Sequence, residues 1–144
     1  MVVYADTSFL FSLYAQDANT VNAANAAKRG RLVLLYTDFH RHELRNAFRL
    51  SVFRGHIDDR ECQRLIQLVE SDASDGCLLD VPLAWTEVFA EAEALSAAHT
   101  GKLGTRAFDI LHVAAAVVLG ALAFYTFDAR QKALAKKAGL KVKP

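Results

Sequence analysis

Two kinds of hydrophobic pattern alternate along the whole chain. Short apolar runs, which are typical of buried strands, occupy residues 2–5, 32–36, 122–126 and 140–142, with a fifth around 78–81. Between them, apolar residues recur every three or four positions, the spacing of helices that bury one face. The helices are expected at residues 7–14, 21–29, 38–53, 58–71, 83–99, 106–119 and 129–137. Alternating strands and helices predict an α/β fold with a central parallel sheet of four or five strands.

Length and composition indicate one domain that spans residues 1–144. With 53% hydrophobic residues, a chain of this size buries enough surface to fold without disulfides or a structural metal. Cys62 and Cys77 lack the spacing of a zinc site or a redox pair. We therefore expect two reduced thiols, with one disulfide as the alternative. The formal net charge of +1 points to no polyanionic partner, so any nucleic-acid site must be local.

The hydrophobic segments do not predict a membrane protein. The N-terminus lacks the pattern of a signal peptide. The longest nearly uncharged segment, residues 110–127, is interrupted by His112 and Gly120, and a buried helix followed by a strand explains it better than a membrane span does. We expect a cytoplasmic protein.

Two aspartates directly follow apolar runs. Asp6 comes after VVYA, and Asp128 comes after the run that contains AFYTF. In parallel sheets, ligands bind outside the carboxyl ends of the strands, where both side chains should lie. The alternative for each is a helix N-cap, because a helix is expected to start after both.

Two further acids are expected on helices. Asp109 lies in RAFDILHVAAAVVLG, which is apolar around its whole circumference and predicts a helix buried on all sides. A carboxylate there needs a metal ion or an ion pair, and Arg106, three residues earlier on the same face, is the alternative partner. Glu43 projects from the apolar stripe of its helix. Its alternative is a rim position paired with His40 or Arg45.

Together these four carboxylates predict a cation site at one edge of the sheet. Unpaired, they would repel one another, whereas Mg²⁺ or Mn²⁺ prefers oxygen ligands of this kind. No histidine–cysteine cluster suggests zinc. The hydroxyls of Thr7, Ser8 and Thr126 flank the acids and could orient a carboxylate or a bound water, or serve as caps and strand residues. His112 is expected to be a hydrogen-bonded core histidine rather than a ligand.

The ordered combination of these pieces resembles the PIN-domain nucleases, especially the VapC-type toxins of toxin–antitoxin pairs. The matching segments are VVYADTSFL, HELRNAF, RAFDILHVAAA and FYTFDARQKALAKKAGLKV, and they span nearly the whole chain. The resemblance implies a three-layer α/β/α domain and a Mg²⁺- or Mn²⁺-dependent endoribonuclease. It also implies a homodimer held by the N-terminal helices and a small antitoxin partner that occludes the site.

The resemblance assigns the catalytic and metal-binding roles to Asp6, Glu43, Asp109 and Asp128. The hydroxyl after the first acid would be that of Thr7 or Ser8. Two segments depart from the family pattern: DFHRHEL before Glu43 is rich in histidine and arginine, and HTGKLGTRAF is a glycine-bearing loop without proline. The expected reaction is metal-assisted hydrolysis of RNA phosphodiester bonds.

Four arginines are the candidates for contacts with RNA phosphates: Arg41, Arg45, Arg106 and Arg130. The first two recur on the helix of Glu43, and the other two adjoin the two late acids. The alternative for each is an ordinary solvated basic face.

Other interpretations remain open. One is a phosphotransfer or receiver-like domain, although Asp6 lacks the second acid of a DxDx[TV] pattern. Another is a PIN-like domain that binds RNA or a protein without cleavage. A third is a nuclease that processes RNA rather than a toxin, and a fourth is a structural domain whose acids are caps and ion pairs.

Overall fold

Five parallel strands form the centre of the molecule in a computed structural model that describes residues 1–144. Their order across the sheet is β3-β2-β1-β4-β5, with β1 at the centre. The strands are β1 (Val2–Ala5), β2 (Val33–Tyr36), β3 (Leu78–Asp80), β4 (Phe124–Tyr125) and β5 (Val142–Lys143).

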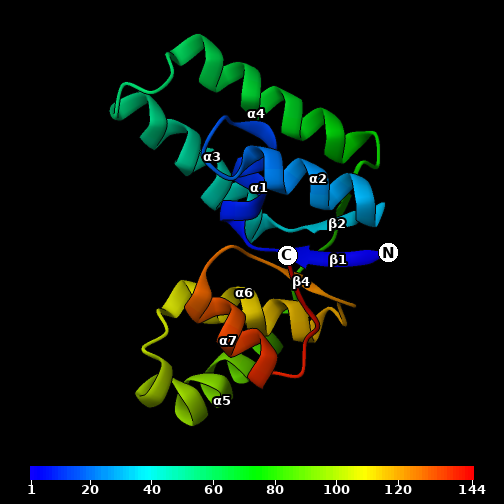
Figure 1. Cartoon of the computed structure of the whole chain (residues 1–144), viewed down its shortest axis with the longest axis vertical. Coiled ribbons are helices and arrows are strands. Elements are labelled where there is room, and N and C mark those ends of the chain that lie inside the picture. Colours follow the sequence, from blue (N-terminus) through cyan, green and yellow to red (C-terminus); the bar gives the residue numbers. More distant parts are fainter.

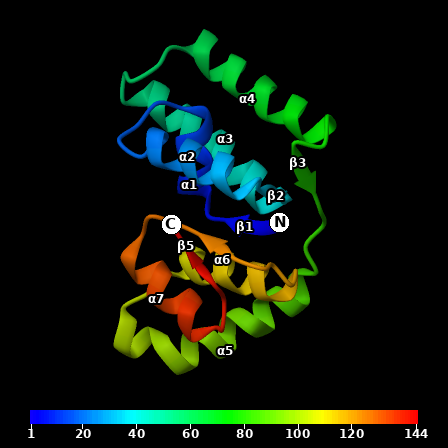
Figure 2. The same cartoon turned by 45° about the vertical axis from the view of Figure 1, so that its right-hand side comes forward.

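Seven helices cover the two faces of the sheet. Those on one face are α1 (Thr7–Tyr14), α2 (Thr20–Gly30), α3 (Asp38–Phe53) and α4 (Asp59–Ser74). Those on the other face are α5 (Trp85–Leu103), α6 (Ala107–Val118) and α7 (Ala129–Lys137). Figures 1 and 2 show the first group above the sheet and the second group below it. The predicted three-layer α/β/α fold with a parallel sheet is therefore confirmed.

Alternate residues of each inner strand belong to two separate hydrophobic cores, one on each face of the sheet. On β1, Val3 and Ala5 belong to the core beneath α1–α4, whereas Tyr4 belongs to the core shared with α5–α7. Strand β4 follows the same rule, with Tyr125 on the first side and Phe124 on the second. This double burial explains why the strands are continuous apolar runs rather than alternating polar and apolar residues.

Three helices, α1, α3 and α7, begin and end at their predicted residues. Strand β4 is shorter than predicted, although backbone hydrogen bonds from Leu122 and Thr126 to neighbouring strands continue on either side of it. The segment HTGKLGTRAF was expected to be a loop, and this is wrong for its first half. Helix α5 continues through Gly101 and ends only at Gly104, whose φ of 64° is favourable for glycine alone.

Both thiols are free, with Cys62 buried and Cys77 exposed. None of the helices has both the length and the apolar character that a membrane crossing requires.

The carboxyl edge of the sheet is organised by helix caps. Asp6 caps α1, and Asp128 caps α7, each accepting a backbone hydrogen bond from the first turn of its helix. Thr37 caps α3 in a capping box whose reciprocal partner is His40. These caps fix the chain exactly where it leaves β1, β2 and β4, so the side chains that follow keep defined positions.

His40 also ties α3 to the central strand. It is fully buried, its Nδ1 accepts from the backbone N–H of Thr37 at 3.2 Å, and its Nε2 donates to the carbonyl of Ala5 at 2.8 Å. Burial, with the nearby charge of His112, lowers the pKa of His40 to about 3. The histidine-rich segment before Glu43 thus has a structural explanation, since one of its histidines replaces the usual Glu or Gln of a capping box.

We expect the free energy of unfolding to fall as the pH drops below 6.5. In this range His40 becomes protonated in the unfolded chain but stays neutral in the folded chain, where its pKa is about 3. The limiting slope for one such proton is about 1.4 kcal/mol per pH unit. Urea denaturation from pH 7 to pH 5 measures it. His40→Gln keeps a capping-box acceptor, and its free energy of unfolding should depend less on pH. The same pH dependence in both proteins would show that the pKa of His40 is not lowered by folding.

Candidate functional site

Asp6 is the most buried of the four predicted acids and lies at the end of the central strand. Its Oδ1 accepts from the backbone N–H of Phe9 at 2.7 Å, and its Oδ2 accepts from the hydroxyl of Thr126 at 2.6 Å. Burial raises the pKa of Asp6, the two hydrogen bonds oppose this, and the charge of Asp109 raises it further. Asp6 is therefore the N-cap of α1, which was the alternative to a site residue. It also lies within range of the charge of Asp109.

Thr126 connects three parts of this edge. Besides its bond to Asp6, its hydroxyl oxygen accepts from the backbone N–H of Asp128 at 3.0 Å and lies 2.9 Å from Oε1 of Gln131. The amide of Gln131 donates in turn to the carbonyl of Asp109 at 3.3 Å. A single hydroxyl thus joins the ends of β1 and β4 to the starts of α6 and α7.

Glu43 faces the same edge from α3 and is held by two side chains. Its Oε2 accepts from the hydroxyl of Thr7 at 2.7 Å and lies 2.5 Å from Nε2 of His112. Burial alone would raise the pKa of Glu43, but the hydrogen bond and charge of His112, with the bond from Thr7, lower it. The expected alternative partners, His40 and Arg45, do not contact Glu43.

The proton on His112 can be placed from its other neighbour. Tyr4 is completely buried, and this burial, together with the charges of Glu43 and Asp6, raises its pKa well above the usual value. Tyr4 therefore keeps its proton and donates it to Nδ1 of His112, 2.9 Å away. Nε2 of His112 is then the nitrogen that donates to the carboxylate of Glu43. The prediction of a hydrogen-bonded core histidine is confirmed.

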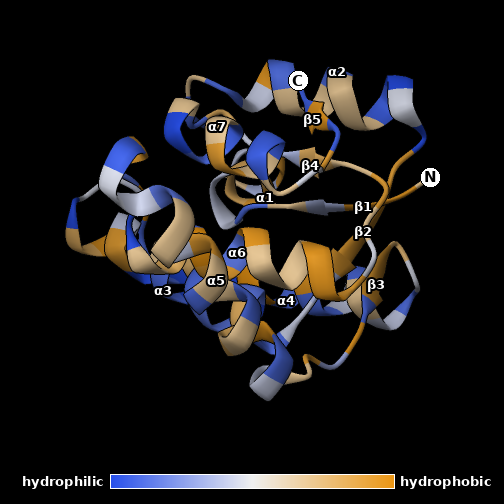
Figure 3. Cartoon of the chain, turned by 90° about the horizontal axis from the view of Figure 1, so that it is seen from below, coloured by the Kyte–Doolittle hydropathy of each residue, from blue (hydrophilic) through white to orange (hydrophobic).

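Asp109 lies in the first turn of α6 and is less buried than its sequence context predicts. Its side chain is 22% exposed and accepts from Nε of Arg106 at 3.0 Å. The prediction that this helix is buried on all sides is wrong, because Phe108 is 59% exposed and only the later turns are enclosed. Figure 3 shows α6 as a largely hydrophobic helix beside α5. The ion pair with Arg106, left open as an alternative, is present.

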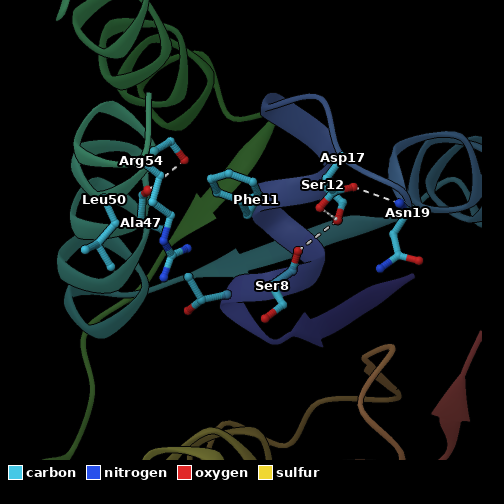
Figure 4. Close-up of a pocket in the computed structure, with 10 residues that line it drawn as sticks. Ser8, Phe11, Ser12, Asp17, Asn19, Ala47, Leu50 and Arg54 are labelled. Carbon is cyan, nitrogen blue, oxygen red and sulfur yellow. Dashed lines mark hydrogen bonds between the residues drawn. The ribbon is translucent and has the colours of Figure 1, made fainter. Parts of the chain in front are cut away.

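Of the two predicted hydroxyls after Asp6, the structure brings only that of Thr7 to an acid. Ser8 is exposed and opens instead into a cleft between α1 and α3, where its carbonyl accepts from Ser12 (Figure 4). The cleft extends from Thr7 and Ser8 to Arg54 at the end of α3. None of the four acids lines this cleft, and Glu43 is connected to it only through its hydrogen bond with Thr7.

The predicted arginines fall into two groups. Arg41 binds the carboxylates of Asp38, Glu70 and Asp80, and Arg45 also pairs with Glu70. Arg41 and Arg45 are therefore paired with residues of α4 and β3 rather than with any of the four predicted acids.

Arg106 and Arg130 adjoin the acids. The hydrogen bond and charge of Asp109, with a smaller contribution from the charge of Asp128, raise the pKa of Arg106. Arg130 donates to the carbonyl of Gly104 at 3.5 Å.

The four acids are not arranged as a ready-made cage. No three Asp, Glu, His or Cys side chains are grouped so that they could hold a metal ion, because each carboxylate is turned to a donor of the protein itself. Their chemistry nevertheless fits a hard divalent cation: all are oxygen donors, and Asp6 and Asp109 lie close enough for one charge to raise the other's pKa. A cation at this edge would relieve that repulsion.

Comparison with known families agrees with this geometry. The family profile of the PIN domain matches residues 3–137, from the second residue of β1 to the end of α7.

The chain belongs to the PIN domain family.

PIN domains are typically metal-dependent nucleases, and the matched region contains all four predicted acids. None of the curated proteins compared with the chain matches it.

Sequence reasoning missed two residues of this PIN-domain site, Tyr4 and Gln131, and it missed the bond of His112 to Glu43. Tyr4 is an ordinary strand residue in sequence, and Gln131 an ordinary helix residue. The one available signal was His112, a polar side chain one turn after Asp109 in an apolar segment, which requires a partner. Its partner is 69 positions away along the chain.

If Asp109 is a cation ligand, as the sequence predicts, Asp109→Asn should weaken Mn²⁺ binding at least about 10-fold, because a charged oxygen donor is lost. Arg106→Ala should leave the melting temperature nearly unchanged, since an exposed ion pair contributes little. Arg106→Ala should not weaken Mn²⁺ binding either, because it removes the guanidinium that competes with Mn²⁺ for Asp109. Calorimetric Mn²⁺ titration and thermal denaturation measure both effects. The opposite result is that Asp109→Asn keeps its Mn²⁺ affinity while Arg106→Ala loses stability. It would show that Arg106 and Asp109 form an ion pair that only stabilises the fold.

Proposed function

We propose that this PIN domain is a Mg²⁺- or Mn²⁺-dependent endoribonuclease that hydrolyses RNA phosphodiester bonds. The observation that carries the proposal is the buried Asp6, kept at the carboxyl edge of the sheet beside Asp109. A carboxylate in such a place is costly to bury, and stability alone does not require a second acid next to it.

The residues proposed to hold the cation are Asp6, Glu43, Asp109 and Asp128. When bound, a divalent cation supplies charge stabilisation of the phosphoryl oxygens and a more acidic water. The hydroxyls of Thr7 and Thr126 orient Glu43 and Asp6 through the hydrogen bonds described above. Ser8 makes no such bond, so we assign it no orienting role.

The reaction adds water across one P–O bond. The water oxygen bonds to phosphorus, the bridging P–O bond breaks, and the leaving oxygen takes up a proton. Arg106, whose side chain is 74% exposed, can exchange its contact with Asp109 for one with a phosphate, and Arg130 lies at the same edge. We do not retain Arg41 and Arg45 as phosphate contacts, because their ion pairs with α4 and β3 already engage them.

We further propose that the enzyme acts as the cytoplasmic toxin of a toxin–antitoxin pair, working as a homodimer with a small antitoxin. The resemblance of its four motifs to VapC-type toxins supports this role. The competing roles are an RNA-processing nuclease and a PIN domain that binds RNA or a protein without cutting.

Purified protein should cleave a mixed RNA pool with Mg²⁺ or Mn²⁺ and lose this activity with EDTA. Asp6→Asn should reduce the rate by about 100-fold or more, because several kcal/mol of transition-state stabilisation depend on the cation. Asp75→Asn, the same exchange at the exposed C-cap residue of α4, serves as the control and should cleave normally. Gel analysis of the RNA products measures the rate. Cleavage that survives both EDTA and Asp6→Asn would refute the proposal.

The toxin role is tested by growth. Induced expression of the wild-type chain in a bacterial host should arrest growth, and expression of Asp6→Asn should not. Co-expression of a small protein encoded immediately upstream should restore growth. If the wild-type chain is active in the cell extract while growth is unaffected, the enzyme processes RNA without being a toxin.

A further inference from the structure

Positive charge is concentrated in two short segments of the chain. Nine of the 17 lysines and arginines lie in residues 28–31 and 129–144, and neither segment contains an aspartate or a glutamate. The rest of the chain carries eight basic side chains against all 16 acids. The net charge of +1 therefore conceals one strongly basic region in a molecule that is otherwise acidic.

The fold brings these two segments together at the edge strand β5. Figure 2 shows β5 between α2 and α7. A groove of about 880 Å³, which is within the size range of ligand sites, lies between the end of α2 and β5. Its charged lining residues are Arg29, Lys141 and Lys143, all exposed, and no aspartate or glutamate lines it. We call this groove, with its three cations, the basic groove.

The cations of the basic groove have no carboxylate partners within the protein. Arg41, Arg64 and Arg106 all form ion pairs, whereas no basic residue in segments 28–31 and 129–144 does. Lysines on an edge strand prevent sheet-to-sheet pairing, and basic residues at a helix end interact favourably with its dipole. These two effects act on each element separately, so neither accounts for Arg29 lining the same groove as two lysines of the sheet edge.

The basic groove begins next to the acidic edge. Phe127 lines the groove and directly precedes Asp128. The carbonyl of Lys143 accepts from the backbone N–H of Thr126 at 3.0 Å, and the hydroxyl of Thr126 donates to Asp6. A polyanion held at the acids through a cation can therefore continue directly into the groove.

We propose that the basic groove binds the phosphate backbone of RNA beyond the bond that is cut. The proposal rests on the proposed ribonuclease function and adds to it a path for the RNA across the β5 edge of the sheet. Unpaired cations attract phosphates, and the counter-ions released on binding make the affinity depend steeply on salt. Because backbone contacts carry no sequence information, the groove strengthens binding of every RNA that is long enough to reach it.

The salt dependence of RNA binding tests the groove directly. The triple variant Arg29→Gln, Lys141→Gln, Lys143→Gln removes its three cations. With EDTA present, so that no RNA is cut, fluorescence anisotropy of a labelled RNA should show at least about 10-fold weaker binding. The slope of log affinity against log salt concentration should be less steep by about 2, because each lost contact to a single strand removes about 0.7. An unchanged slope would refute the proposal.

A matched triple variant separates the groove from the overall charge. Arg49→Gln, Arg54→Gln, Arg60→Gln removes the same number of charges from exposed arginines that form no ion pair. It should keep the wild-type slope. Equal losses in the two triple variants would show that RNA responds only to net charge and would overturn the proposal. If the groove triple does not unfold cooperatively on heating, Lys141→Gln alone should still lower the slope by about 0.7.

Cleavage kinetics distinguish this proposal from the nuclease proposal. The groove triple should raise the KM for a long RNA and leave kcat unchanged, and it should cleave a trinucleotide, which is too short to reach the groove, like the wild type. Groove-dependent binding without any cleavage would refute the nuclease and keep the groove. Cleavage of long RNA with the same KM in the groove triple would refute the groove and keep the nuclease.

The same cations could instead serve a free nucleotide or an anionic membrane. Calorimetric titration with ATP and co-sedimentation with phosphatidylserine vesicles supply these two probes. We expect neither probe to bind more weakly to the groove triple than to the wild type at physiological salt. Groove-dependent binding of ATP or of vesicles, with the same RNA slope in both proteins, would assign the groove to that ligand and overturn the proposal.

Discussion

The carboxylate of Asp6, buried at the end of the central strand, is the constraint on which the acidic edge depends. An ionised side chain in this place must be hydrogen-bonded, and its two donors come from different elements. Phe9 can donate only if α1 starts immediately after β1, and Thr126 can donate only if β4 lies beside β1. The strand order and the helix start therefore satisfy the same carboxylate that we propose as a cation ligand.

The second interaction crosses the layers of the fold. Glu43 belongs to α3 on one face of the sheet, and His112 belongs to α6 on the other, with Tyr4 of β1 behind it. Because Tyr4 holds the proton that orients the histidine, the direction of Glu43 depends on the packing of both cores. This part of the site thus lies where the two cores meet.

The acids are bonded to different kinds of partner, and these partners differ in how far they are buried. Asp6 and Glu43 are held by buried hydroxyls and a buried histidine, whereas Asp109 is held by an arginine that is mostly in solvent. A cation or a phosphate would displace the exposed arginine far more easily than the buried partners. The open side of the site is therefore the side of Arg106 and Phe108.

Much of this architecture follows from the sequence. Apolar runs and helical spacing place Asp6 and Asp128 after strands, and this position alone brings both to the carboxyl edge of a parallel sheet. The limits of α1, α3 and α7 also follow from local signals, because caps and periodicity act within a few residues. The end of α5 does not, since Gly101 resembles a helix end and only Gly104 takes the left-handed conformation.

What the sequence by itself determined was the order of the elements, the parallel sheet and the set of acids at its edge. Only the tertiary structure decided which side chains meet: His112 with Glu43 and Thr126 with Asp6 at this edge, and Arg41 with Glu70 and Asp80 elsewhere on α3. The physical reason is that periodicity defines the faces of one element, whereas contacts between faces depend on how elements distant along the chain pack together.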